Sequence, residues 1–213
     1  MSQPSSAALL VIDLQPDFLP GGALAVADGD ALLAPIAKLM RSGTFGTIVA
    51  TQDWHPRRHI SFASQHPPHR SFDVITLYGR EQVLWPDHCV AGSSGAELAP
   101  SLPWTAVRAI VRKGTDPAVD SYSGFRNNFD AHGQRPPTGL AGYLRDCGIT
   151  AVTICGLARD YCVRWSAEDA AALGFTTTVF WDLTRPVDPA SDSAVRHALA
   201  TCGVRVIDSS ALR

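Results

Sequence analysis

Residues 8–13 read Ala-Leu-Leu-Val-Ile-Asp, a run of five apolar residues that ends in a carboxylate. Such an uninterrupted run is typical of a strand that is buried on both faces of a sheet. Runs of this kind recur along the chain and alternate with segments in which apolar residues have helical spacing. The other predicted strands are 47–51, 106–111, 151–155, 177–181 and 204–207. This alternation predicts an α/β fold with three layers, in which helices cover both faces of a mostly parallel, six-stranded sheet.

The helical segments between these strands have recognisable ends. The predicted helices are 31–40, 139–147, 160–173 and 191–201, and a glycine follows each of them. A glycine at that place readily ends a helix. With 213 residues, 46% hydrophobic and 18% charged, the composition is that of an ordinary globular protein, and we expect one domain spanning 1–213.

One connection is much longer than the others. Residues 54–104 separate the second and third predicted strands, with little periodic pattern and much Pro, His, Ser and Gly. Five of the seven histidines of the chain lie in it. Long connections in compact domains are usually either functional or disordered. The tryptophans in this one disfavour disorder, so we expect a functional loop.

Composition and charge exclude several classes of protein. The net charge of −2 gives no electrostatic reason to expect a nucleic acid or an anionic membrane as partner. No apolar run reaches the length of a transmembrane helix, roughly 18 residues. Residues 1–6 lack the features of a signal peptide. The five cysteines are odd in number, scattered and without CxxC spacing, which predicts a reducing compartment, the cytoplasm.

The predicted strand ends bring together residues that suit acyl transfer. Ligands of open α/β sheets bind beyond the carboxyl ends of the strands. Asp13, Asp53 and Lys113 follow three of these ends, and Cys162 lies in the first turn of the helix after the fourth strand. A helix N-terminus and a nearby lysine favour the thiolate, and a carboxylate could accept the thiol proton. The alternative is that Cys162 is a small buried apolar residue.

The segment Asp53-Trp54-His55 predicts metal ligands. Alternate residues of an extended segment share a side, so the carboxylate and the imidazole face the same way. A third ligand from the long loop would complete a set with open positions, and His59 and His88 are the candidates. The alternative for each of these histidines is a solvated loop residue.

In these segments the chain resembles a known family, the nicotinamidases (pyrazinamidases) within the isochorismatase-like cysteine hydrolases. The resemblance extends over nearly the whole chain and rests on several segments in a fixed order. They are 11–18, 21–26, 51–56, 85–90, 112–114, 122–125 and 156–163. The chain departs from the family at Arg159, where relatives usually carry a small polar residue, and in residues 182–186. Both departures concern substrate preference more than mechanism.

The resemblance implies roles for named residues. The catalytic triad would be Asp13, Lys113 and Cys162. The backbone N–H groups of Ala158 and Cys162 would form the oxyanion hole, next to a cis peptide between Leu157 and Ala158. The metal ligands would be Asp53, His55 and His88, with His59 a ligand in some relatives. The walls of the substrate pocket would be Phe18, Leu24, Trp85, Tyr122, Leu157 and Ala158.

The activity implied by the resemblance is hydrolysis of nicotinamide, and of pyrazinamide, to the acid and ammonia through a cysteine thioester, as a step of NAD salvage. One divalent metal ion, with zinc ahead of iron and manganese, would assist substrate binding. Three alternatives stay open. They are a related cysteine amidase with another small carboxamide as substrate, a hydrolase whose nucleophile is a metal-bound hydroxide, and a binding protein. A homo-oligomer is compatible with the sequence.

Overall fold

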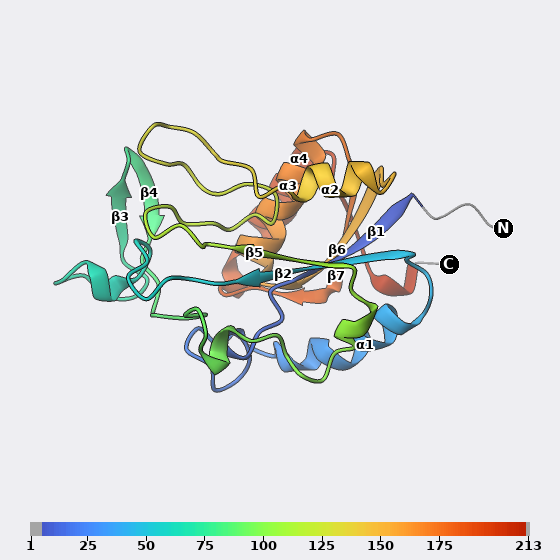
Figure 1. The fold of residues 1–213 in the computed structure, drawn as a ribbon, viewed down its shortest axis with the longest axis horizontal. Helices are drawn as coiled ribbons and strands as arrows, with labels where there is room; N and C mark the ends of the chain where they lie inside the picture. The colour runs from blue at the N-terminus through green and yellow to red at the C-terminus, as the bar shows by residue number, and fades with distance from the viewer. Residues whose placement is uncertain (1–5, 212–213) are drawn as a thin grey trace.

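The computed structural model describes residues 6–211 (Figure 1). Its main sheet contains β1 (Ala7–Ile12), β2 (Thr47–Asp53), β5 (Ala109–Lys113), β6 (Ala151–Leu157), β7 (Thr176–Arg185) and β8 (Arg205–Ile207). The strand order is β5-β2-β1-β6-β7-β8, and every neighbouring pair is parallel. The predicted six-stranded α/β fold is therefore confirmed. The order reverses between β1 and β6, and ligands of such sheets bind at that reversal.

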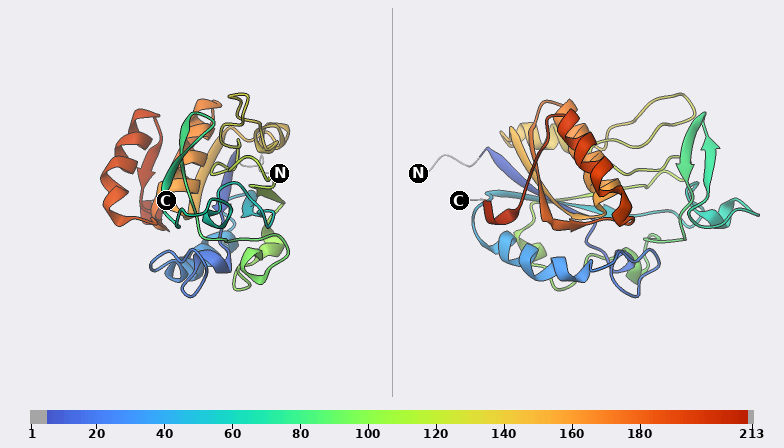
Figure 2. Two further views of the ribbon diagram at one scale, coloured as in Figure 1. Left: turned by 90° about the vertical axis from the view of Figure 1, so that its left-hand side faces the viewer. Right: turned by 180° about the vertical axis from the view of Figure 1, so that it is seen from behind.

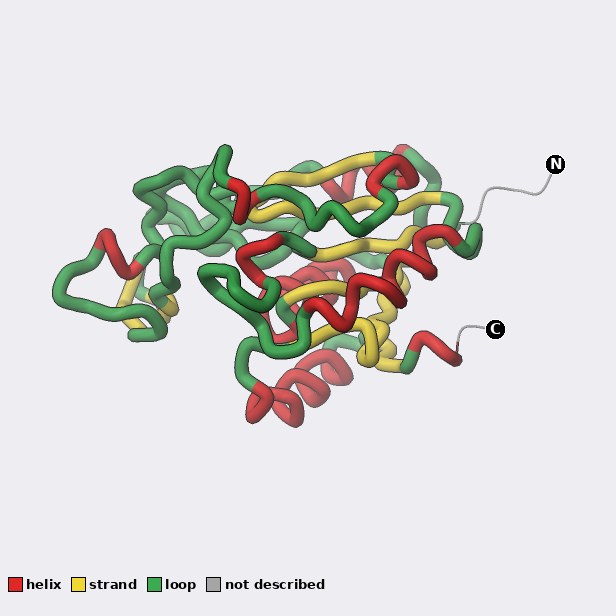
Figure 3. Tube along the Cα trace, turned by 90° about the horizontal axis from the view of Figure 1, so that it is seen from below, coloured by secondary structure: helices red, strands yellow, loops and turns green. Residues whose placement is uncertain are grey.

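Helices cover both faces of the sheet, which makes three layers. The helix α1 (Leu33–Arg41) lies on one face, as Figure 3 shows from below. The helices α2 (Leu140–Asp146), α3 (Arg164–Ala172) and α4 (Asp192–Thr201) lie on the other face (Figure 2, right). Three of the four were predicted to within two residues at each end. The helix expected from residue 160 begins at Arg164, because residues 159–163 form a separate π-helical turn.

The central position of β1 in the sheet explains why its sequence is apolar without interruption. Leu9 and Val11 pack in one apolar cluster with Ile36 of α1. Leu10 packs in the other cluster, with Leu144 of α2. Each of these side chains is fully buried, and complete burial of an aliphatic side chain stabilises the fold by about 1.5–3 kcal/mol.

Two predicted strand boundaries were wrong. The third strand of the prediction began at residue 106, but β5 begins at Ala109 because Trp104–Ala106 forms a 3-10 turn. The fifth was expected to end at residue 181, but β7 continues to Arg185. After a register shift between Ile154 and Gly156, β6 pairs again with this extension. The extension contains polar residues, so the apolar pattern used to predict strands did not include it.

The long connection contains a hairpin that the sequence analysis did not predict. Strands β3 (Val74–Leu77) and β4 (Arg80–Val83) pair antiparallel, and the turn residues Tyr78 and Gly79 both have positive φ. The hairpin projects at the end of the molecule toward which β2 points (Figures 1 and 2). Each strand has only four residues, too short for a periodic pattern to stand out.

Among residues 6–211, no helix is both long enough and apolar enough to span a membrane. Residues 1–5, on which most of the expectation about a signal peptide rests, lie outside the described part of the chain.

Candidate active site and metal centre

The structure brings Asp13, Lys113 and Cys162 together at the carboxyl end of the sheet. Asp13 follows β1, Lys113 is the last residue of β5, and Cys162 lies in a π-helical turn, Arg159–Val163, that follows β6. The ammonium nitrogen of Lys113 lies 2.9 Å from Asp13 Oδ2 and 3.4 Å from Cys162 Sγ. All three side chains are buried, so these charges interact with little screening by water.

The two oxygens of Asp13 have different environments. Oδ1 accepts a hydrogen bond of 2.6 Å from the Thr51 hydroxyl. Oδ2 forms the ion pair with Lys113 and has no further partner among the described residues. An Asp13 oxygen and Cys162 Sγ are within 4.8 Å of each other. Burial raises the pKa of Asp13 in spite of Lys113, and a carboxylate with a raised pKa suits a group that must accept a proton and release it again.

Burial opposes the thiolate that the helix N-terminus and the lysine were expected to favour at Cys162. Burial raises the pKa of Cys162 well above its ordinary value, and the charges of Asp13 and Asp53 raise it further against the effect of Lys113. The helix N-terminus and the lysine are present as predicted, but neither outweighs the loss of solvent. Burial also lowers the pKa of Lys113, yet the two carboxylates raise it well above its usual value, so the ammonium stays charged.

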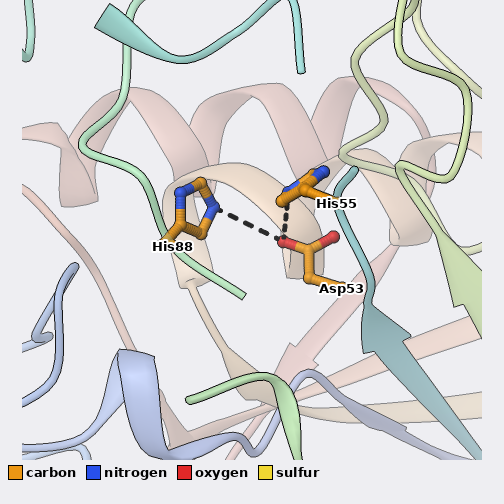
Figure 4. Close-up of side chains that lie close together, drawn as sticks. All are labelled: Asp53, His55 and His88. Atoms are coloured by element: carbon orange, nitrogen blue, oxygen red, sulfur yellow. Dashed lines mark ion pairs between the residues drawn. The ribbon is translucent and has the colours of Figure 1, made fainter. Parts of the chain in front are cut away.

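A second cluster consists of Asp53, His55 and His88, as Figure 4 shows. Nε2 of His55 lies 3.4 Å from Asp53 Oδ2, and Nε2 of His88 lies 3.8 Å from the same oxygen. In each ring Nδ1 faces a backbone carbonyl, that of Gly114 at 3.0 Å and that of Pro86 at 2.8 Å. Because a carbonyl can only accept, Nδ1 of each ring must donate, and a neutral ring then presents a lone pair at Nε2.

This donor set fits a divalent cation. One carboxylate oxygen and two imidazole nitrogens with their lone pairs converge on one point, and their other nitrogens are held by carbonyl groups. Zinc sites in proteins have this construction. Burial raises the pKa of Asp53, but the charge of Lys113 is the largest of the effects that outweigh burial and hold this pKa well below its ordinary value. Asp53 is therefore ionised and able to coordinate a cation.

Neighbouring residues hold Asp53 and His55 of this cluster in place. Gln15 accepts a hydrogen bond from the Asp53 backbone N–H at 2.7 Å and donates one to the Asp53 carbonyl at 2.8 Å. Asp53 Oδ1 forms an ion pair with Lys113, which leaves Oδ2 for the histidines. Gly114 has φ +64°, and a Cβ at this position would collide with the His55 ring. A glycine is therefore required where the chain leaves β5.

His59 lies beside this cluster with both ring nitrogens occupied. Nδ1 is 2.7 Å from the Ser61 hydroxyl and Nε2 is 3.3 Å from the Val119 carbonyl. The ring packs against the His55 ring with centroids 4.2 Å apart. Burial, followed by the charge of His55, lowers the pKa of His59 to about 4. His59 also lies near Asp120 and His55 in a second group of donor atoms.

Both clusters open onto one pocket. Of the predicted walls, Phe18, Leu24, Trp85, Tyr122 and Ala158 line it, together with Cys162 and the three predicted metal ligands. Leu157 is not among the lining residues, and its side chain is fully buried. The ring of Tyr161 packs edge-on against Trp85 and Tyr122, with centroids 4.7 and 5.3 Å away. Aromatic walls of this kind suit a small flat ring.

The sequence analysis missed four residues that line the pocket, namely Asp120, Ser121, Tyr161 and Val187. Tyr161 stands next to Cys162 in the sequence, and Asp120 and Ser121 stand close before Tyr122, so adjacency was an available signal for these three. Asp120 is buried and accepts hydrogen bonds from Gln82 of β4 and from the Ser121 N–H. Val187 belongs to the connection after β7, and no pattern pointed to it.

The turn before the nucleophile has the expected unusual backbone. The peptide between Leu157 and Ala158 is cis. The Ala158 carbonyl accepts hydrogen bonds from the N–H groups of Tyr161 and Val163, at 3.2 and 3.0 Å. These bonds close the turn around Cys162, so Ala158 and Cys162, the two residues expected to supply the oxyanion hole, both face the pocket.

Comparison with known proteins places the chain in a family. The model of the isochorismatase domain matches residues 7–211. A nicotinamidase of Acinetobacter baylyi is 45% identical over 213 residues, which cover 98% of this chain and 95% of the relative. The chain therefore belongs to the isochorismatase family, as the seven segments predicted.

Two solved structures of similar proteins contain ligands. PnC1 from L. infantum in complex with nicotinate has a TM-score of 0.84 and 40% identity, with 98% of this chain and 96% of that chain covered. The pyrazinamidase of Pyrococcus horikoshii in complex with zinc has a TM-score of 0.76 and 34% identity, with 95% of this chain and 99% of that chain covered.

Proposed function

We propose that this chain hydrolyses nicotinamide to nicotinate and ammonia, and pyrazinamide in the same way, through a thioester on Cys162. The observation that carries the proposal is the pocket onto which Cys162, Asp53, His55 and His88 all open between aromatic walls. Catalytic thiols and metal ligands of this kind at one small apolar pocket suit a flat heteroaromatic amide. The nicotinamidase and pyrazinamidase relatives support this choice of substrate.

We further propose that Asp53, His55 and His88 hold one divalent metal ion. When bound, zinc, or iron or manganese in its place, would supply a Lewis acid for the ring nitrogen of the substrate. The zinc in the Pyrococcus relative supports this assignment. His59, with both nitrogens already occupied, would support the His55 ring rather than act as a ligand.

In the first half of the reaction Cys162 is the nucleophile. The thiol passes its proton to Asp13, an oxygen of which lies within 4.8 Å of the sulfur. The sulfur then forms a bond to the carboxamide carbon, and the carbonyl oxygen accepts hydrogen bonds from the N–H groups of Ala158 and Cys162. When the carbon–nitrogen bond breaks, protonated Asp13 gives its proton to the leaving nitrogen. Ammonia departs and a nicotinoyl thioester remains.

In the second half a water molecule attacks the thioester carbon and loses a proton to Asp13. The carbon–sulfur bond breaks, nicotinate leaves, and Asp13 returns the proton to the sulfur. Asp13 thus alternates between base and acid, and its raised pKa suits both roles. Lys113 contacts Asp13 and Cys162 throughout, and its fixed positive charge balances whichever of them is ionised.

The proposal is tested by ammonia release from nicotinamide, with metal content measured on the same sample. We expect turnover of nicotinamide and pyrazinamide, and a loss of turnover in Cys162→Ala. Cys202→Ala is the matched control, because Cys202 is exposed at the end of α4. Full ammonia release by Cys162→Ala would contradict the thioester and favour a hydrolase in which the cysteine has no role.

A second experiment separates the nucleophile from the metal site. Nicotinaldehyde can form a reversible adduct with Cys162 that has no leaving group and resembles the tetrahedral intermediate. Benzaldehyde offers the same reaction but has no ring nitrogen. We expect competitive inhibition by both, weaker for benzaldehyde by roughly a hundredfold, the cost of an unpaired polar site. Equal potency would contradict recognition of the ring nitrogen while leaving the nucleophile in place.

A further inference from the structure

Two buried side chains join the turn that carries the nucleophile to a second wall of the pocket. The nucleophile turn is residues 158–163, and the second wall is the β7–α4 connection, residues 186–191, which carries Val187. Asp160 and Arg159 are 7% and 5% exposed, and neither takes part in the proposed chemistry. Their side-chain hydrogen bonds reach the connection and the elements at its two ends.

Asp160 holds the middle of the connection. The backbone N–H groups of Val187 and Asp188 donate to its two carboxylate oxygens, each at 2.9 Å, and the Ser191 hydroxyl lies 3.3 Å from one of them. Hydrogen bonds from backbone N–H groups to a carboxylate are strong and directional. The backbone of Val187 is therefore fixed to a residue two positions before Cys162.

Arg159 holds the two ends of the same connection. It donates to the hydroxyl and the carbonyl of Thr184, near the end of β7, at 2.9 and 2.7 Å. It also donates to both carboxylate oxygens of Asp192, the first residue of α4, at 2.7 Å. Its guanidinium lies over the Trp181 ring, 3.9 Å from the centroid. The side chain thus points away from the pocket, and its departure from the family pattern does not alter the pocket rim directly.

We propose that Asp160 and Arg159 are positioning residues that set the place of Val187 relative to Cys162, and so decide how much room the substrate ring has. The inference rests on the proposed amidase function. Val187 is an aliphatic wall of the pocket, and one extra methyl group in a close-fitting pocket changes kcat/KM by roughly 10- to 200-fold. Substrate preference therefore reports on its position.

The test compares nicotinamide with ring-methylated nicotinamides in Asp160→Asn, Val187→Ala and the double variant. The kcat/KM ratio of nicotinamide to the methylated amides should fall about tenfold in each single variant, through KM rather than kcat. The double variant should show no further fall, because both changes act on the same wall. Glu168→Gln is the control, since it breaks only the partly exposed Arg164–Glu168 ion pair, and its ratio should match the wild type.

A lower kcat with an unchanged ratio in Asp160→Asn, or multiplying effects in the double variant, would overturn the proposal. If Asp160→Asn does not fold, Asp192→Asn replaces it, and a smaller fall in the same ratio is expected because Asp192 is partly exposed. Hydrogen exchange at the amides of Val187 and Asp188 should be faster in Asp160→Asn, whichever amide the enzyme cleaves. If the wild type cleaves no nicotinamide, the proposed function fails, and unchanged exchange would still overturn the positioning role.

Discussion

The two clusters of the active site differ in how their charges are balanced. Around Cys162, one ammonium lies between a thiol and two carboxylates, so this cluster is complete without any added ion. Around Asp53, two imidazole nitrogens and a carboxylate oxygen face one another with no proton donor between them when the rings are neutral. The first cluster is built to move a proton, and the second is built to hold a cation. The Lys113 ammonium contacts Asp13 in the first cluster and Asp53 in the second.

Because of this difference, we expect that a substitution in one cluster can abolish the role of that cluster and leave the other cluster intact. Changes around Cys162 should stop the reaction and leave the metal content intact. Changes around His88 should remove the metal and weaken substrate binding.

The largest effect is expected from Asp13→Asn. The amide has nearly the same size but cannot accept the thiol proton, so kcat should fall by roughly 10²- to 10⁴-fold. The metal content should stay at the wild-type value, because Asp13 is not among the predicted ligands. Steady-state kinetics and metal analysis of the same preparation provide the check. Wild-type kcat in this variant would exclude Asp13 as the proton carrier.

Metal removal should come next in size. Chelation of the wild type, or His88→Ala, should lower kcat/KM for nicotinamide by about a hundredfold or more, since the ring nitrogen loses its partner. More than one divalent ion should restore the chelated wild type but not the variant. The matched control is His132→Ala, which changes an exposed histidine. A metal-free sample with full activity would contradict the role of this cluster.

His59→Ala should have a smaller effect. The His59 ring packs on His55 and is held by Ser61 and Val119, so its loss should loosen His55 without removing a ligand. Changes of supporting residues typically weaken metal binding by about 10- to 100-fold, and we expect the lower end. Titration of the chelated protein with zinc measures the change. A loss as complete as that in His88→Ala would show that His59 is itself a ligand.

The smallest expected effect concerns stability in mild acid. The pKa of His59 is lowered to about 4 in the folded chain, from 6.5 in the unfolded chain, so the unfolded state takes up a proton first as the pH falls. Stability from His59 is therefore complete above pH 6.5 and is lost toward pH 4. Between pH 6.5 and 5.5 the loss should be about 1 kcal/mol. Urea unfolding of metal-free protein should show this loss in the wild type and lack it in His59→Asn.

The same contrast between regions explains what the sequence could predict. Asp13, Lys113 and Cys162 stand at the ends of strands with strong apolar patterns, and parallel strands bring such ends together whatever the loops do. The metal residues His55 and His88 lie in an irregular connection, and the resemblance to a family, rather than periodicity, favoured His88 over the other candidate, His59. The fold class followed from the alternation of apolar strands with helical segments.

The remaining features depend on packing that no local pattern encodes. The extension of β7 to Arg185 needs the register shift opposite Gly156, and the β3–β4 hairpin is too short to give a pattern. Val187 reaches the pocket because Asp160 and Arg159 hold its loop, a contact between segments more than 20 residues apart. The raised pKa of Cys162 follows from burial, which depends on the whole fold.

The central claim is a covalent nicotinoyl intermediate on Cys162. The most direct measurement is a single turnover of carbonyl-labelled nicotinamide with excess enzyme, quenched in acid at successive times, with the label then located by peptide mapping. The account predicts label on the Cys162 peptide that appears as ammonia is released and disappears as nicotinate forms. Ammonia release at the full rate, with no label on Cys162 at any time, would contradict it.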